Sequence, residues 1–324
     1  MAGQFGLDAV SPSCSKLSGM TNLRLKSAPT LSFIFFALCS VCSAQKAAIT
    51  FDDLPRNGDL PPGVTQTETA KAAVAILKKK HIPPTYGFLN AIRLEGSPDG
   101  AEALKIWAAS EPVGNHTYSH IDLEKNTPEA WERDLAQDEP TLELLSPSGD
   151  WHWLRYPYLH EGETVEKRRA VREYLKAHGY RIAEVTIDWE DYLWNFAYAR
   201  CAAKHDGQAI AWLHSSYLST ASEFIDLERA QSQLLFGRDI HYVVLMHLGA
   251  YTSTILPEAI DLLRKKRFQF ETLEEAEKDP AYASDVDVGI KDGGTLLDQL
   301  MLVKKLPMPP HEEKPYDKLE HICE

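Results

Sequence analysis

The sequence has no excess of positive charge, few cysteines and no long apolar run, and each shortage excludes a class of protein. Lysine and arginine total 34 against 47 aspartates and glutamates, which gives a formal net charge of −13. Nucleic acids and anionic membranes are bound through basic surfaces, so this balance argues against both as partners. A neutral or cationic polymer remains compatible with it as a substrate.

The sequence contains few cysteines, which limits the roles that cysteine can have. It contains five cysteines, and no Cys-x-x-Cys pair follows residue 45, which argues against a cysteine-bound metal. Only Cys201 and Cys323 lie beyond the N-terminal region. In an oxidising compartment they are able to pair and fix the tail to the body, but the sequence does not decide whether they do.

The N-terminal region has the layout of a secretory signal. Basic residues precede the apolar run Leu31–Cys42, and the small residues Ser43 and Ala44 follow it. This run is too short to cross a bilayer as a helix, so we expect no stable membrane anchor. We expect a leader that is cleaved after Ala44, and hence an exported protein, periplasmic or secreted. Met20 is a better candidate for the start than Met1, because residues 1–19 lack the character of a signal, but the sequence does not settle the true start.

From residue 45 to about 280, short apolar runs alternate with amphipathic stretches. The expected strands are Ala47–Phe51, Thr85–Leu89, Trp153–Tyr156, Arg181–Ile187, Ile240–Met246 and Phe268–Thr272. The expected helices are Thr67–Lys80, Gly100–Ala109, one from Thr127 that ends or kinks before Pro140, Val165–His178, Ser222–Phe236 and Pro257–Lys266. This alternation predicts one α/β domain with a mainly parallel sheet, open or closed into a barrel. Residues 281–324 are expected to form a loosely packed extension.

Two short segments carry the ligands of a metal site. His116 and His120 are four residues apart, so a helical turn would place both imidazoles on one face, close enough to hold one cation. Asp52 and Asp53 end an apolar run and add a third ligand with a base beside it. Three protein ligands leave one position open, as catalytic metal sites do. The pattern predicts a metal-dependent hydrolase.

Ionisable residues follow four of the expected strands. They are Asp52 and Asp53, Arg155, Asp188 and Asp191, and His247. Barrel folds build their active sites at the carboxyl ends of the strands. We therefore expect these side chains to meet at one end of the sheet.

Five segments, in the same order, resemble the motifs of the polysaccharide deacetylase family, the NodB homology domain of carbohydrate esterase family 4. They are Thr50-Phe51-Asp52-Asp53, His116-Thr117-Tyr118-Ser119-His120, Arg155-Tyr156-Pro157-Tyr158, Asp188-Trp189-Glu190-Asp191 and Leu245-Met246-His247. The resemblance covers residues 47 to about 275. It implies a distorted (β/α) barrel with about seven strands, and a single catalytic domain at 45–280 that follows the leader at 1–44. Its members remove acetyl groups from N-acetylated sugars or from acetylated xylan.

The resemblance also implies roles for the motif residues. Asp53, His116 and His120 should bind a divalent metal, zinc in the first place, with cobalt or nickel as alternatives. Asp52 should be the general base that deprotonates a metal-bound water, and His247 the general acid that protonates the leaving group.

Three further residues should support this base and acid. Arg155 should hold Asp52 in its ionised form through a charge-assisted hydrogen bond. Asp191 should keep the His247 imidazole protonatable, and Asp188 should share that task.

Contacts to the substrate follow from the same resemblance. A backbone N–H near Tyr158 should stabilise the oxyanion, and Leu245, with Trp189 or Tyr192, should wall a methyl-sized pocket. For the aromatic residues, core packing is an equal alternative. Leu54 stands where the family usually has glycine, and Tyr192 where it usually has tryptophan. Both departures are expected at the rim of the site, where they affect the substrate rather than the metal.

The leading functional hypothesis is therefore removal of N-acetyl groups from a peptidoglycan- or chitin-like amino sugar. O-acetyl ester cleavage on xylan, or hydrolysis of a small non-sugar amide by the same machinery, is the main alternative. An inactive carbohydrate-binding relative is a third, and the intact Asp52, Arg155 and His247 speak against it. Oligomeric state, polymer identity and the role of residues 281–324 are left open.

Overall fold

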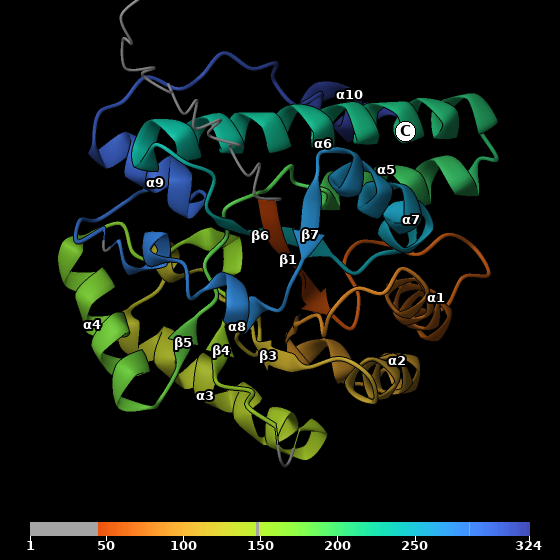
Figure 1. Cartoon of the computed structure of the whole chain (residues 1–324). Helices are drawn as coiled ribbons and strands as arrows, with labels where there is room; N and C mark the ends of the chain where they lie inside the picture. Colours follow the sequence, from red (N-terminus) through yellow and green to blue (C-terminus); the bar gives the residue numbers. More distant parts are fainter. Residues whose placement is uncertain (1–44, 147–148, 285) are drawn as a thin grey trace, which may run out of the picture. The chain divides into compact units, whose positions relative to one another are not determined.

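Strand β1 (Gln45–Leu54) lies at the centre of a parallel sheet in the computed structural model, which describes residues 45–146, 149–284 and 286–324 (Figure 1). All eight residues from Ala47 to Leu54 are buried, as expected of a strand that is covered on both faces. Thr50, Asp52 and Asp53 are the polar residues among them. The expected leader, with its cleavage after Ala44 and its candidate start at Met20, lies outside the described residues. Among the described residues, we find no helix that is both long and apolar enough to span a membrane.

The other strands arrange themselves around β1. They are β2 (Gly87–Leu89), β3 (Val113–Asn115), β4 (Trp153–Leu154), β5 (Arg181–Ile182), β6 (His241–His247) and β7 (Phe268–Phe270). Their order is β5-β4-β3-β2-β1-β6, β7 pairs with the start of β1, and every pairing is parallel. Because the strands run in one direction, their carboxyl ends meet at one edge of the sheet, and the polar residues that follow the strands meet there too.

The sheet curls until its two ends come together. The expected strand Arg181–Ile187 is split: Arg181 and Ile182 pair with β4 as β5, whereas Ile187 forms a bridge to Val244 of β6. The chain thus crosses from one end of the sheet to the other within a few residues. This crossing produces the distorted (β/α) barrel of seven strands that the sequence predicts.

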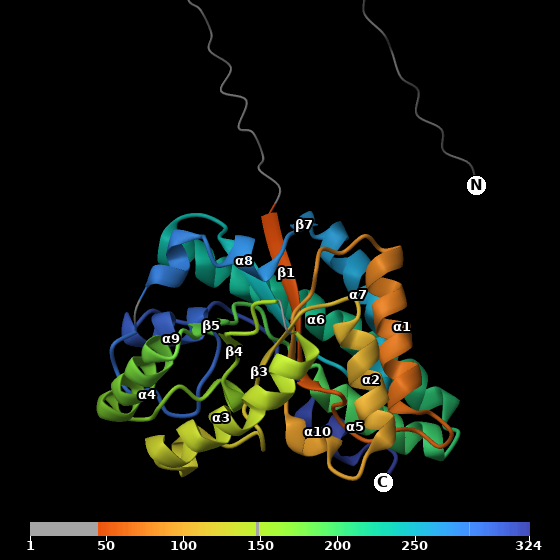
Figure 2. The same ribbon diagram turned by 90° about the horizontal axis from the view of Figure 1, so that it is seen from below.

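Ten α-helices are described, and they cover the sheet on the outside (Figures 1 and 2). They are α1 (Gln66–Lys79), α2 (Pro98–Ala108), α3 (Pro128–Leu145), α4 (Val165–Ala177), α5 (Tyr192–Ala203), α6 (Gly207–Phe236), α7 (Ala250–Lys265), α8 (Leu273–Ala276), α9 (Leu296–Val303) and α10 (Tyr316–His321). Short 3₁₀ turns lie at Ala91–Leu94, Leu123–Lys125, Pro157–Leu159 and Pro280–Ala283. The start at Thr127 is confirmed, since its hydroxyl accepts from the Ala130 N–H as a helix cap.

Several helix boundaries differ from those expected. Helix α3 does not end before Pro140, because the buried Trp131, Leu135 and Leu142 hold both halves against the core. Helix α6 begins fifteen residues before Ser222, where Asp206 caps its first turn. Helix α5 was not predicted at all. Its apolar residues point in all directions, as they do in a buried helix, and this hides the helical period.

The C-terminal segment is packed into the domain rather than loosely attached. Val286, Ile290, Leu296 and Leu300 form a buried apolar cluster, which contacts the end of α6. Leu319 of α10 belongs to the main core. The expectation of a loose tail was therefore wrong, because scattered apolar residues in glycine- and proline-rich sequence showed no period.

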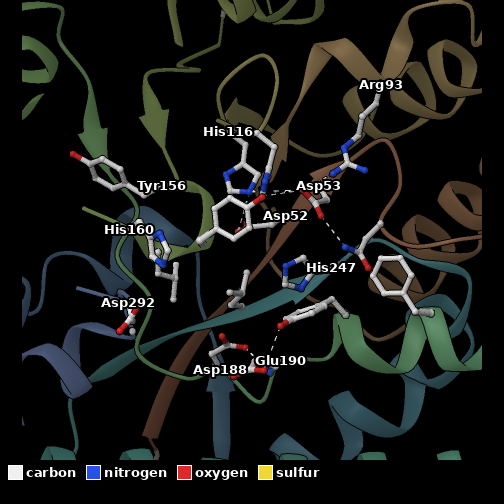
Figure 3. Close-up of a pocket in the computed structure, with 18 residues that line it drawn as sticks. Asp52, Asp53, Arg93, His116, Tyr156, His160, Asp188, Glu190, His247 and Asp292 are labelled. Carbon is white, nitrogen blue, oxygen red and sulfur yellow. Dashed lines mark hydrogen bonds and ion pairs between the residues drawn. The ribbon is translucent and has the colours of Figure 1, made fainter. Parts of the chain in front are cut away.

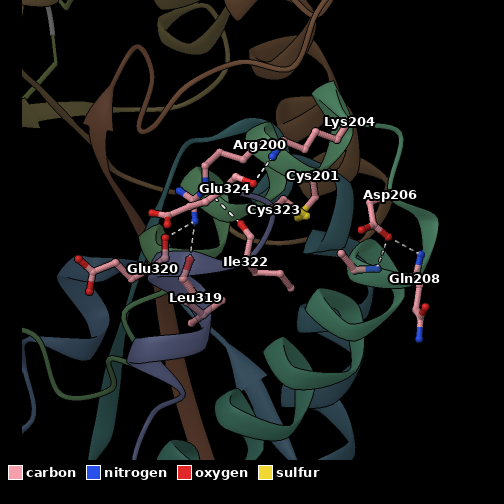
Figure 4. The surroundings of a disulfide bond; sticks show 11 residues. Arg200, Cys201, Lys204, Asp206, Gln208, Leu319, Glu320, Ile322, Cys323 and Glu324 are labelled. Carbon is pink, nitrogen blue, oxygen red and sulfur yellow. Dashed lines mark hydrogen bonds between the residues drawn. A yellow bond between two sulfur atoms is a disulfide. The ribbon is translucent and has the colours of Figure 1, made fainter.

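A disulfide joins Cys201 of α5 to Cys323, one residue before the C-terminus (Figure 4). The Arg200 guanidinium beside it donates to the backbone carbonyls of Leu319 and Ile322. The pairing left open by the sequence is thus present. It fixes the end of the chain to α5.

Removal of this disulfide should destabilise the protein. The bond closes a loop over a sequence separation of 122 residues, so its loss releases a large chain entropy in the unfolded state. We expect the double variant Cys201→Ala, Cys323→Ala to lose about 2–5 kcal/mol of unfolding free energy. Urea denaturation followed by tryptophan fluorescence measures this. A variant with the same urea midpoint as the oxidised wild type would contradict the expectation.

Candidate active site

A pocket of ≈ 480 Å³ opens at the carboxyl ends of the strands (Figure 3). Nine of the residues singled out from the sequence line it: Asp52, Asp53, His116, His120, Tyr158, Asp188, Tyr192, Leu245 and His247. They come from segments almost 200 positions apart in the chain, and the parallel sheet brings them to one edge. Figure 3 shows Asp52, Asp53, His116 and His247 grouped in its centre.

Asp53, His116 and His120 converge at the bottom of this pocket. One ligand atom from each lies within 4.8 Å of the others. Asp53 Oδ1 is 3.5 Å from His120 Nε2 and 3.8 Å from His116 Nε2. The structure therefore brings the three expected ligands together.

The two histidines do not share a helical turn, as the spacing had suggested. They lie on a loop after β3, in which Thr117 and His120 have left-handed backbone angles, φ 61° and 59°. Asn90 holds this loop by donating from Nδ2 to the carbonyls of His116 and Thr117. The imidazoles thus meet through a bent loop, with ring centroids 4.9 Å apart.

Hydrogen bonding fixes which nitrogen of His116 faces the pocket. Its Nδ1 is 2.7 Å from the carbonyl oxygen of Arg155. A carbonyl only accepts, so Nδ1 carries the proton and Nε2 presents a lone pair. Burial lowers the pKa of both His116 and His120, which keeps the imidazoles neutral as metal ligands must be.

The environment of Asp53 fits a cation. Burial opposes its ionisation, but Arg93 and His120 outweigh this and hold the pKa of Asp53 well below its usual range. Its Oδ2 accepts from Asn57, and its buried Oδ1 is ion-paired with Arg93 Nη2 at 3.1 Å without an aligned hydrogen bond among the described residues. One carboxylate oxygen and two imidazole nitrogens suit zinc, cobalt or nickel better than magnesium. The residues present therefore fit a divalent metal.

Asp52 lies directly beside these three residues. Its Oδ1 accepts from Arg155 Nη1 at 3.0 Å, and its Oδ2 is 3.6 Å from His116 Nε2. Burial raises the pKa of Asp52 to about 6, although Arg155 works in the opposite direction. Arg155 is itself buried and is held by the Ala183 carbonyl. Asp52 is thus a fixed carboxylate that gains a proton just below neutral pH.

His247 ends β6 and is the register partner of Asp52 on the neighbouring strand β1. Its Nδ1 donates to Asp191 Oδ1 at 2.7 Å, and Thr252 donates to the other oxygen of Asp191. Burial alone would lower the pKa of His247, but the bond and charge of Asp191 raise it to about 9. The imidazole is therefore protonated at neutral pH, which is the state of a general acid.

The remaining expected contacts are only partly in place. Tyr158 and Leu245 line the pocket, and the Tyr158 ring lies 4.5 Å from that of His120. Asp188 lines it as well, and burial raises the pKa of Asp188 to about 6. Trp189 does not: it is buried and packs edge-on against Tyr217. Tyr192 is therefore the aromatic of this motif that reaches the pocket.

Leu54 is not at the rim of the site, where it was expected. It is fully buried in the core, and Gly87 of β2 leaves room for it. A Cβ at Gly87 would lie 2.1 Å from Leu54 Cδ1, so the missing side chain in β2 compensates for the larger one in β1. This departure from the family pattern is a change of core packing.

Sequence reasoning missed several residues of the pocket. Arg93 contacts Asp53 with an Nη2–Oδ1 distance of 3.1 Å, and Asn57 donates to the same carboxylate. Glu190, Phe196 and Asp292 also line the pocket. The position of Asn57 in the loop after β1 could have marked it as a pocket residue. Arg93 lies in a 3₁₀ turn with no motif around it.

Part of the chain is similar in sequence to known proteins. Residues 42–183 match the family model for polysaccharide deacetylase. A chitin deacetylase of Arthroderma benhamiae is 27% identical over 146 residues, a region that covers 45% of this chain and 34% of that protein. The alignment thus spans about a third of the relative.

A solved structure is similar over a longer stretch. The chitin deacetylase of the fungal pathogen Colletotrichum lindemuthianum superposes with a TM-score of 0.50 at 19% identity, covering 78% of this chain and 93% of that one. At this identity the likeness shows the fold, the distorted barrel described above. The matched segment, residues 42–183, is thus similar to the polysaccharide deacetylase family.

Proposed function

We propose that this protein is a metal-dependent deacetylase that removes N-acetyl groups from a carbohydrate built of amino sugars, like chitin or peptidoglycan. One observation carries the proposal: Asp52, which is bonded to Arg155, and His247, which is bonded to Asp191, are neighbours on β1 and β6 beside the three candidate metal ligands. Their pKa values, about 6 and about 9, leave one ionised and the other protonated at neutral pH. This is the pairing that amide hydrolysis by general base and general acid requires.

In this proposal Asp53, His116 and His120 hold the divalent metal, with zinc as the first choice. The metal supplies Lewis-acid activation of the attacking water and of the carbonyl oxygen. Asp52 takes the proton of the attacking water, and Arg155 keeps its carboxylate oriented between turnovers. His247 gives its Nε2 proton to the leaving amine, while Asp191 stabilises the imidazolium.

The pocket wall supplies the remaining interactions. A backbone N–H near Tyr158 stabilises the oxyanion, and Leu245 packs against the acetyl methyl group. Tyr158 and Phe196 expose 55% and 41% of their surface at the pocket, which suits contact with the apolar faces of sugar rings. We propose residues 45–280 as the catalytic domain, with residues 281–324 as an extension packed against it.

The similarity to a chitin deacetylase supports the choice of an N-acetylated amino sugar, together with an exported location. Cleavage of O-acetyl esters on xylan is the second candidate, because the same base and metal serve both reactions. The protonated His247 favours the amide, since an amine leaves only after it accepts a proton, whereas an alcohol needs that proton less.

Removal of the metal should abolish activity, and its return should restore it. We expect acetate release from N-acetylglucosamine oligomers to stop after chelation by EDTA and to recover with one equivalent of zinc or cobalt. The protein is tested in parallel on acetylated xylan. Acetate release only from xylan would mean that the protein is an O-acetyl esterase and not an N-deacetylase. Metal-independent release, or none from either polymer by the zinc-loaded protein, would refute the proposal.

A further inference from the structure

The C-terminal strap, defined as residues 307–324, runs along α5 and contacts both of its ends. At the far end, Cys323 is bonded to Cys201, and Arg200 donates to the carbonyls of Leu319 and Ile322 (Figure 4). At the near end, Lys314 and Tyr316 contact Glu190, two residues before α5 begins. This near end is the part of the molecule that carries Asp191, the partner of His247.

Both contacts of the strap at the pocket are to one carboxylate. Lys314 Nζ lies 2.8 Å from Glu190 Oε1, and the Tyr316 hydroxyl donates to the same oxygen at 2.9 Å. Glu190 lines the pocket and has a left-handed backbone angle, φ 56°. A glutamate pays a conformational cost there, so its position depends on the bonds that hold it.

Lys314 is a buried cation among three carboxylates. Only 9% of its side chain is exposed, and its Nζ also lies 4.2 Å above the ring of Phe224. Besides the contact with Glu190, its charge stabilises the ionised forms of Asp188 and of the buried Glu228. Without Lys314, these carboxylates would face one another with no compensating lysine. Such a cluster rearranges or takes up protons.

Glu190 is linked to the proposed general acid, His247, through Tyr192. The Tyr192 hydroxyl is 3.4 Å from Glu190 Oε2, and the Tyr192 ring packs edge-on against His247 with centroids 5.3 Å apart. The Glu190 N–H also donates to Asp188 at 2.7 Å. A shift of Glu190 therefore moves the ring that packs on His247 and the turn that carries Asp191.

We propose that Lys314 and Tyr316 are positioning residues for the general acid, and that the strap they belong to is a working part of the active site. The disulfide keeps the strap in place, and the strap holds Glu190, Tyr192 and through them His247 in one arrangement. The inference rests on the proposed function, and it gives a role to a segment that lies outside the matched family region.

The test uses two substrates that differ in their need for His247. Amide cleavage of the N-acetylglucosamine tetramer requires a protonated leaving amine, whereas p-nitrophenyl acetate releases a stable anion without help. In Lys314→Met we expect kcat on the tetramer to fall about tenfold, with KM little changed, because misplacement of a catalytic group by a fraction of an ångström has effects of this size. Ester cleavage should stay within about twofold of wild type, and Lys314→Arg should restore most of the amide activity.

A matched control and an activity-independent readout complete the test. Lys318→Met removes another lysine of the strap, one that lies over Trp212 and away from the pocket, and should change neither reaction. Hydrogen–deuterium exchange of the peptide 186–198 should become faster in Lys314→Met and in the double cysteine variant, but not in Lys318→Met. An equal loss of amide and ester activity, or unchanged exchange, would overturn the inference. If wild type released no acetate, the proposed function would fail, and the exchange result alone would decide on the strap.

Discussion

Replacing Asp52 by asparagine should reduce acetate release from the N-acetylglucosamine oligomer by a factor on the order of 10²–10⁴, which is the usual contribution of a general base. Asparagine has the same shape and still accepts a hydrogen bond from Arg155, so the site should keep its geometry. Its amide cannot take a proton from water. Zinc content, measured after dialysis, should stay at one equivalent, because Asp53, His116 and His120 are untouched.

The pH dependence gives an independent check of this base. Asp52 works in its ionised form, and its pKa is raised to about 6 by burial, so kcat/KM should fall as the pH drops through this value. A divalent cation beside the carboxylate would move this limb to lower pH. Asp292→Asn removes another carboxylate of the pocket wall, one that lies outside the metal and base groups, and should retain the profile. A variant Asp52→Asn with normal activity would assign the base to another residue.

Replacing His247 by asparagine should separate amide from ester chemistry. We expect the rate on the N-acetylglucosamine oligomer to fall by a factor on the order of 10²–10³, but the rate on p-nitrophenyl acetate to change by less than about tenfold. His247 works in its protonated form, and Asp191 raises its pKa to about 9 against the effect of burial. Wild-type activity should therefore decline above about pH 9, with a bound metal moving this limb lower, and the variant should lack this limb.

A parallel loss of both activities in His247→Asn would point to a structural role for this histidine. Thr252→Val is a useful companion variant, because the Thr252 hydroxyl bonds Asp191 but does not reach the pocket. It should shift the alkaline limb to lower pH without removing it, since one of the bonds that orient Asp191 is lost.

The core of the site could be predicted from the sequence because its residues stand at the ends of recognisable apolar strands. Asp52 and Asp53 follow β1, and His247 ends β6, so parallel pairing alone brings them to one edge. The pairs Arg155–Asp52 and Asp191–His247 were implied by the family resemblance, and the structure contains both contacts.

What could not be predicted depends on irregular backbone. The loop that carries His116 and His120 is bent by two left-handed residues and held by Asn90, and no periodic pattern reports such a loop. Arg93 reaches Asp53 from a short 3₁₀ turn. The same limit hid Lys314, since a lone lysine in a proline-rich tail gives no signal until the fold shows the carboxylate that it contacts.

The place of β1 in the sheet also constrains how the chain folds. This strand comes first in the domain, yet its main partner is β6, and its N-terminal residues pair with β7. The β1–β6 ladder can therefore close only after residue 247 has been made, and the β1–β7 pairing only after residue 270. Pairings this far apart in sequence are slow to form. An apolar strand that waits for its partner is prone to aggregate. Nascent chains that stop before β6 should depend on chaperones, and chains truncated there should accumulate in the insoluble fraction.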